Sequence, residues 1–183
     1  MRCRFIFTLM AVLFVVPASV GTQTGRVTLQ ATVSETVTLS VAPGFSQSHV
    51  DVVSSGGNTV RITLSGNDPV IRVPLLVRSN TSFKISAELE TGELSQLLVT
   101  DVHPTGSLVS PHIVNSIDKR PKMDLNVTGP FLIASGPRVS LGGTLDSPNN
   151  ALQITVLINL KPQQVRGSPV RLTFVATAGS LIQ

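Results

Sequence analysis

The chain has 183 residues, 42% of them hydrophobic and 13% charged, with a formal net charge of +4. This length suits one ordinary domain, and the only cysteine, Cys3, leaves no second thiol for a disulfide framework or a zinc–thiolate site. Tryptophan and tyrosine are absent and the basic residues are scattered, which argues against ring-stacking ligand surfaces and against a nucleic-acid interface.

A predominantly apolar run at residues 5–16 follows Arg2 and Arg4 and is followed by small residues up to Gly21. This pattern predicts a secretory signal peptide over residues 1–21, with cleavage after Gly21 or, alternatively, after Ala18. The run is shorter than the roughly 20 apolar residues that span a bilayer, and no second long apolar run follows. We therefore expect a single domain over residues 22–183, without a membrane span, that is secreted, periplasmic or at the bacterial cell surface.

Apolar and polar residues alternate with a period of two through most of the remaining chain. Two faces near its start consist of Val27, Leu29, Ala31 and Val33, and of Val37, Leu39 and Val41. Further alternating segments lie at residues 60–64, 83–89, 123–127, 152–160 and 170–178. Alternation that is rich in β-branched residues is typical of strands half-buried against one core.

Residues 70–77 are more uniformly apolar and predict another strand. Pro74 is expected at an edge or a bulge of that strand, because proline has no N–H to donate to a neighbour. Residues 97–102 and 138–141 are further strand candidates, whereas residues 102–121 predict a long loop or an edge excursion. Gly, Pro, Asn and Asp gather between the strands and predict turns, at residues 42–44, 54–58, 66–69 and 146–150.

These segments together predict an all-β fold of about eight to ten strands, since no long helical pattern interrupts them. The spacing favours an antiparallel, immunoglobulin-like β-sandwich with Greek-key connections, and a closed barrel is the alternative. Because the exported domain has no disulfide, burial and strand pairing alone must hold it together.

Two short pairs of ligand-type side chains raise the question of a metal site. His49 with Asp51, and Asp101 with His103, each stand two residues apart, and His112 could join them. Zinc accepts histidine nitrogen and carboxylate oxygen, with three protein ligands in an open catalytic site. Such pairs are common by chance, so we favour solvated side chains, and no metal or other cofactor is predicted.

The chain offers no pattern that indicates an enzyme. No strand–turn–helix nucleophile motif is present, and the densest acidic residues, Glu88, Glu90 and Glu93, fall on or beside the polar face of one predicted strand. Asn80 and Asn126 each begin an Asn-x-Ser/Thr glycosylation pattern, which matters only in a host that uses it. We therefore expect a non-enzymatic protein.

The alternating residues 27–41 and 170–178, near the two ends of the predicted domain, suggest assembly by strand addition. An exported, cysteine-free β-sandwich with these two segments resembles bacterial fimbrial (pilin-type) subunits. The resemblance implies that the N-terminal segment is donated to a neighbouring subunit, so that the partner is a second copy or a related subunit.

The predicted function is therefore a secreted, non-enzymatic structural or adhesive surface protein. Its sharpest form is a pilin-like subunit in which Val27, Leu29, Ala31 and Val33 fill a groove of the next subunit. The alternative is a monomeric extracellular or periplasmic module that binds a peptide or a carbohydrate.

Overall fold

The computed structural model describes residues 34–65, 68–107, 109–126, 129–139, 150–162 and 168–179. All of them belong to one compact unit, Ser34–Gln183. The predicted signal peptide and the predicted strand at residues 27–33 lie outside the described residues.

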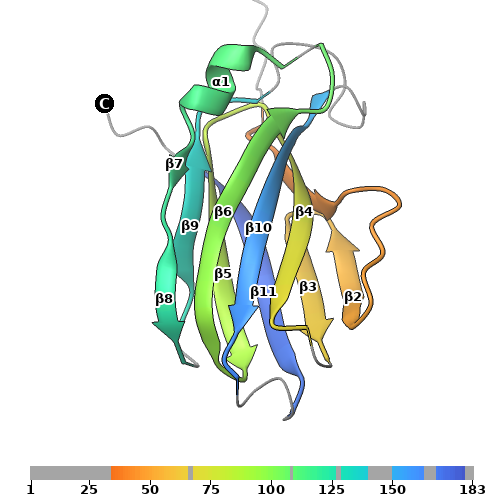
Figure 1. The fold of residues 1–183 in the computed structure, drawn as a ribbon. Helices are drawn as coiled ribbons and strands as arrows, with labels where there is room; N and C mark the ends of the chain where they lie inside the picture. Colours follow the sequence, from red (N-terminus) through yellow and green to blue (C-terminus); the bar gives the residue numbers. More distant parts are fainter. Residues whose placement is uncertain are drawn as a thin grey trace, which may run out of the picture. The chain divides into compact units, whose positions relative to one another are not determined.

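Within this part of the chain, eleven strands and one short helix form two antiparallel sheets (Figure 1). Sheet A has the order β1-β4-β10-β6-β8, and sheet B has the order β2-β3-β11-β5-β9-β7. The strands of sheet A are β1 (Val37–Val41), β4 (Val70–Ser79), β6 (Leu94–Pro104), β8 (Lys122–Leu125) and β10 (Leu152–Leu160). Those of sheet B are β2 (Val50–Gly56), β3 (Thr59–Leu64), β5 (Phe83–Thr91), β7 (Asp118–Lys119), β9 (Phe131–Gly136) and β11 (Val170–Ala178), and the helix is α1 (Pro111–Asn115).

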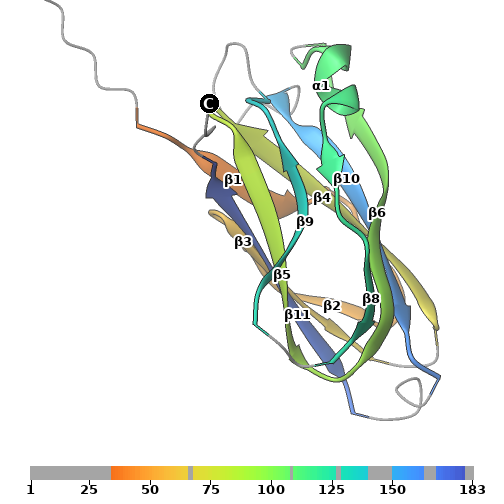
Figure 2. The ribbon, with the colours of Figure 1, turned by 90° about the vertical axis from the view of Figure 1, so that its left-hand side faces the viewer.

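The two sheets lie face to face as a sandwich, which Figure 2 shows from the side. Connections that pass between the sheets place β10 between β4 and β6, and β11 between β3 and β5. Because sequence neighbours are separated in this way, the central strands of each sheet pair with segments far away in the chain. The prediction of an antiparallel all-β sandwich with Greek-key connections is confirmed.

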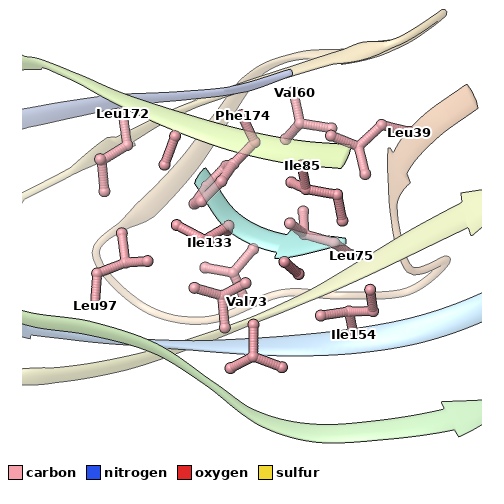
Figure 3. Close-up of a cluster of buried hydrophobic side chains, with 14 of the residues drawn as sticks. Leu39, Val60, Val73, Leu75, Ile85, Leu97, Ile133, Ile154, Leu172 and Phe174 are labelled. Carbon is pink, nitrogen blue, oxygen red and sulfur yellow. The ribbon is translucent and has the colours of Figure 1, made fainter. Parts of the chain in front are cut away.

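The core lies between the sheets and is built by the period-two pattern. In β10, Leu152, Ile154, Val156 and Ile158 are fully buried, and the residues between them are only partly buried. In β11, Phe174 faces inward, and Figure 3 shows side chains of both sheets directed toward one another around it. Successive side chains of a strand point to opposite faces, so alternation in the sequence becomes one apolar face per sheet.

Of the strands predicted from alternation, those at residues 37–41, 60–64, 83–89, 152–160 and 170–178 are present, and the one at 123–127 is present up to Leu125. The strands predicted at residues 70–77 and 97–102 are present as well. The sequence analysis missed β2, β9 and the two-residue β7, because their sequences do not alternate. Residues 138–139 lie outside any strand, so the strand predicted at 138–141 is wrong for the part that is described. The long loop predicted at residues 102–121 contains the end of β6, α1 and all of β7.

Pro74 lies in an interior strand, which corrects the expected edge or bulge position. β4 is flanked by β1 and β10, but β1 ends at Val41, and the N–H of Ala42 donates to the carbonyl of Pro74 at 2.9 Å. The backbone nitrogen of Pro74 therefore faces Ala42, the first residue after the end of β1. Proline is tolerated there because no further ladder hydrogen bond is needed.

The two sheets are connected along both lateral edges of the sandwich. On one side, the N–H of Leu39 in β1 donates to the carbonyl of Gly57 (2.8 Å), and that of Val41 donates to Ser55 Oγ (2.9 Å). On the other side, the chain passes from β7 in sheet B to β8 in sheet A, and the N–H of Arg120 donates to the carbonyl of Ile133 at 2.8 Å. The β1 edge of sheet A is thus bonded to the β2–β3 hairpin of sheet B.

Candidate ligand pocket

A pocket of about 380 Å³ opens on sheet B where β5 begins and where β9 and β11 end. It is lined by Ser82, Phe83, Lys84, Ser116, Asp118, Ser135, Gly136, Pro137 and Gly179. These residues come from four segments that are far apart in the sequence. Figure 1 shows α1, which directly precedes Ser116, at this end of the sandwich.

Strand pairing arranges the polar lining residues in one row across sheet B. Lys84 pairs with Thr177 of β11 on one side and with Ser135 of β9 on the other, and Ser135 pairs in turn with Asp118 of β7. Phe83 points into the core, so Lys84, the next residue of β5, points outward. Lys84 and Asp118 are two strands apart, which separates their Cα atoms by roughly 10 Å.

Two glycines shape this corner of the pocket. A Cβ on Gly136 would lie 2.4 Å from Ile117 Cδ1 and 3.0 Å from Phe83 Cε1, so Ile117 packs directly onto the bare backbone of β9. This contact holds the neighbouring residues, Ser116 and Asp118, at the pocket. A Cβ on Gly179 would lie 3.3 Å from Ser82 Oγ, so a longer side chain there would reach into the pocket.

Within the described part of the chain, the charges of the pocket are one paired carboxylate and one ammonium without an ion-pair partner. Asp118 Oδ2 accepts a charge-assisted hydrogen bond from Arg120 Nε at 2.8 Å. Lys84 forms no ion pair with any other described residue. The hydroxyls of Ser82 and Ser135 likewise form no hydrogen bond within the described part of the chain, whereas Ser116 Oγ donates to the carbonyl of His112 at 3.0 Å. The pocket thus offers a few donors and acceptors on a lining that is otherwise largely apolar.

The same residues do not form a catalytic arrangement. The lining contains no histidine and no cysteine, and no hydrogen bond joins one of its serine hydroxyls to Lys84 or Asp118. A serine nucleophile needs a base within hydrogen-bonding distance.

The metal-type side chains named in the sequence analysis meet only in part. His103 Nδ1 and Asp101 Oδ2 are 2.8 Å apart on the outer face of β6, and both side chains are about half exposed. His49 precedes β2, Asp51 lies within it, and His112 lies in α1. Across the described residues, no group of three or more His, Cys, Asp or Glu side chains could hold a metal ion.

The acidic residues of β5 lie on its solvent face, as expected. Glu90 Oε1 is 3.1 Å from Arg61 Nε and accepts a hydrogen bond from Thr173 Oγ1 across three neighbouring strands. Glu93 pairs with Lys161 at 3.0 Å. Glu90 and Glu93 therefore each form an ion pair at the surface, Glu90 with Arg61 of the same sheet and Glu93 with Lys161.

Asn80, the first residue of one glycosylation pattern, anchors the start of β1. Its Oδ1 accepts the N–H of Thr36 (2.7 Å), and its Nδ2 donates to the carbonyl of Ser34 (2.8 Å). Asn126 Oδ1 accepts a hydrogen bond from Lys161 Nζ at 3.4 Å, and the next two residues of that pattern are not described.

The residues predicted for strand addition divide into two groups. Val37, Leu39 and Val41 form β1 of this chain's own sandwich, where Leu39 is fully buried. Val27, Leu29, Ala31 and Val33 lie outside the described residues. The outer edge of β2 has no strand neighbour in the described structure, and it carries Val52 and Val53 at 39% and 60% exposure.

The sequence analysis missed the pocket. Its polar residues are serines, one lysine and one aspartate, which are common on the solvent face of any strand. The sequence feature that could have pointed to the pocket is a pair of glycines, Gly136 at the end of β9 and Gly179 directly after β11.

In comparisons with known proteins, no protein-family model and no curated protein matches the chain. Among solved structures, the chain is similar to the N-terminal cellulose-binding domain of β-1,4-glucanase C from Cellulomonas fimi. The identity is 11%, the match covers 80% of this chain and 91% of that chain, and the TM-score is 0.31. A likeness at this level does not indicate what this chain binds. Among the described residues, no helix is long and apolar enough to cross a membrane.

Proposed function

We propose that this chain is an exported, non-enzymatic binding or adhesion module, and that the pocket on sheet B holds its ligand. The observation that carries the proposal is the pocket itself, where Lys84, Ser82 and Ser135 present polar groups without a partner in the described structure. Its volume of about 380 Å³ lies within the usual range of small-molecule sites, roughly 300–1,000 Å³.

The pocket is also supported by rigid elements. Three of its segments are ends of strands that pair in one sheet, and the fourth packs onto β9 through Ile117. A site on paired strands holds its groups in place before the ligand arrives, which lowers the entropy cost of binding. Export through the signal pattern at residues 1–21 would place this module in the periplasm, at the cell surface or in the medium.

A pair of glycine variants tests whether the pocket binds. In Gly179→Leu the new side chain begins in contact with Ser82 and Lys84, two lining residues of the pocket, whereas a Cβ on Gly129 meets nothing within 4 Å. The probe is a panel of immobilised glycans and short peptides, with thermal unfolding as the check on folding. We expect Gly179→Leu to lose binding and Gly129→Leu to keep it. Equal binding by the two variants would overturn the pocket as the site.

A second function, assembly by strand addition, is favoured by the exposed outer edge of β2. An unpaired edge with exposed valines is a template for an added strand. Val27, Leu29, Ala31 and Val33 supply an alternating apolar face in the same chain, and the partner would be a second copy or a related subunit. β1 itself is committed to its own sandwich through Leu39, so this proposal depends on residues 27–33.

Two variants on opposite faces of the alternating segment test this second function. Val33→Asp places a charge on the apolar face, and Thr32→Asp places the same charge on the polar face. We expect Val33→Asp to abolish oligomers in light scattering behind size exclusion, with the monomer still folded, and Thr32→Asp to keep them. Unchanged oligomers in Val33→Asp contradict strand donation.

A further inference from the structure

The chemistry of the pocket narrows the class of its ligand. On the basis of the proposed function, we infer that the pocket binds an acidic sugar residue, a hydroxylated ring that carries a carboxylate. The carboxylate pairs with Lys84, and the ring hydroxyls pair with the serines and with Asp118.

The argument for the carboxylate is electrostatic. Asp118 is already neutralised by Arg120 at 2.8 Å, so its charge does not cancel that of Lys84. Lys84 therefore supplies the uncompensated charge among the lining residues. A ligand anion gains a charge-assisted hydrogen bond there, which is roughly twice as strong as a neutral one.

The argument for a hydroxylated ring comes from the remaining groups. Ser82 and Ser135 can each donate and accept a hydrogen bond, because neither hydroxyl has a partner in the described structure. Ser116 keeps acceptor capacity while it donates to the carbonyl of His112, and Asp118 retains acceptor sites beside its bond to Arg120. A mixed set of donors and acceptors suits ligand hydroxyls, which do both.

No exposed aromatic ring lines the pocket, so the charge of the ligand has to contribute to its affinity. Phe83 is the one aromatic residue of the lining, and its side chain is 1% exposed, so it cannot stack on a sugar. Neutral sugars that lack a stacking platform gain little from hydrogen bonds, because each one replaces a bond to water. The ion pair with Lys84 would supply the affinity that stacking supplies elsewhere.

The size of the pocket fits one such residue. A volume of 380 Å³ equals about a dozen water molecules at roughly 30 Å³ each. One uronic acid has a similar number of non-hydrogen atoms. A longer acidic glycan would place one residue in the pocket and continue outward over sheet B.

The experiment compares glucuronic acid, glucose and acetate in titrations of the isotope-labelled chain, followed through its backbone amide signals. Glucuronic acid and glucose differ in the carboxylate, and acetate carries the carboxylate without the ring. We expect glucuronic acid to bind tightest and to shift the amides of Lys84, Ser135 and Gly136. Lys84→Gln should weaken its binding about two- to fivefold, as expected for an exposed charge pair, and Lys84→Arg should keep it.

The other outcomes separate this inference from the proposed function. Equal affinity for glucose and glucuronic acid, with both lost in Gly179→Leu, overturns the acidic ligand and leaves the pocket as a binding site. Acetate binding as tightly as glucuronic acid overturns the sugar ring. Shifts confined to residues away from the pocket overturn both the ligand class and the proposed site.

Discussion

The same strands of sheet B form a filled apolar core at the centre of the sheet and an open pocket with polar groups at its end. At the centre, β11 and β5 direct Phe174, Leu172 and Ile85 into a core in which each is fully buried. At the end, the same two strands run into glycine, serine and lysine, and the space beside Gly179 stays open. In β5 the division falls between neighbouring residues, because Phe83 faces the core and Lys84 faces the pocket. Binding groups can therefore change without a change in the core.

The largest effect should come from the filled centre. Phe174→Ala removes the largest fully buried side chain of β11 and leaves a cavity between the sheets. We expect the free energy of unfolding to fall by about 3–5 kcal/mol, measured by urea denaturation. Ligand binding by the fraction that stays folded should be unchanged. A loss below about 1 kcal/mol would show that the centre of the sandwich is not close-packed.

An intermediate effect is expected at the boundary between the two regions. Gly136→Ala places a Cβ 2.4 Å from Ile117 Cδ1 and 3.0 Å from the Phe83 ring. The end of the Ile117 side chain can move, so we expect a loss of about 1 kcal/mol, together with shifted amide signals at Ser116 and Asp118.

The matched control for this variant is Gly129→Ala, since a Cβ at Gly129 meets nothing within 4 Å. Its stability should stay within about 0.5 kcal/mol of the parent chain. If the two alanine variants were equally stable, with Ser116 and Asp118 unmoved, the close approach of Ile117 to β9 would not position the pocket.

The smallest effect should come from the solvent face of the sheet centre. Glu90→Gln removes the ion pair with Arg61, whose side chain is 49% exposed against 30% for that of Glu90. Exposed pairs contribute little, so we expect a loss of about 0.2–1 kcal/mol that shrinks further at high salt. Denaturation at low and high ionic strength measures it. A loss above about 2 kcal/mol, independent of salt, would mean that this network is as important as the core.

The local alternation of apolar and polar residues was sufficient to predict the strands that show it. The inward residues of β10 follow from period two alone, as do those of β3, β5 and β11. Among the missed strands, β2 escaped the analysis because it is almost fully exposed on both faces and has no apolar face to display. The position of Pro74 was also misjudged, because the sequence shows neither that β4 lies between β1 and β10 nor that β1 ends opposite Pro74.

The candidate site shows the same division. Asp101 and His103 stand two residues apart on one strand, so their contact could be anticipated from spacing. The association of Lys84 with Ser135 and Asp118 could not, because it depends on the pairing register of β5, β9 and β7.

The sequence by itself therefore determined the class of fold and which side chains of the regular strands face the core, because both depend on a local period. The tertiary structure alone decided the strand order, the bridging of the β1 edge and the pocket. The pocket joins residues 82–84, 116–118, 135–137 and 179, and no local property of these four segments specifies that they meet. Their meeting is set by the burial of the whole apolar face of each sheet, which selects one register among many.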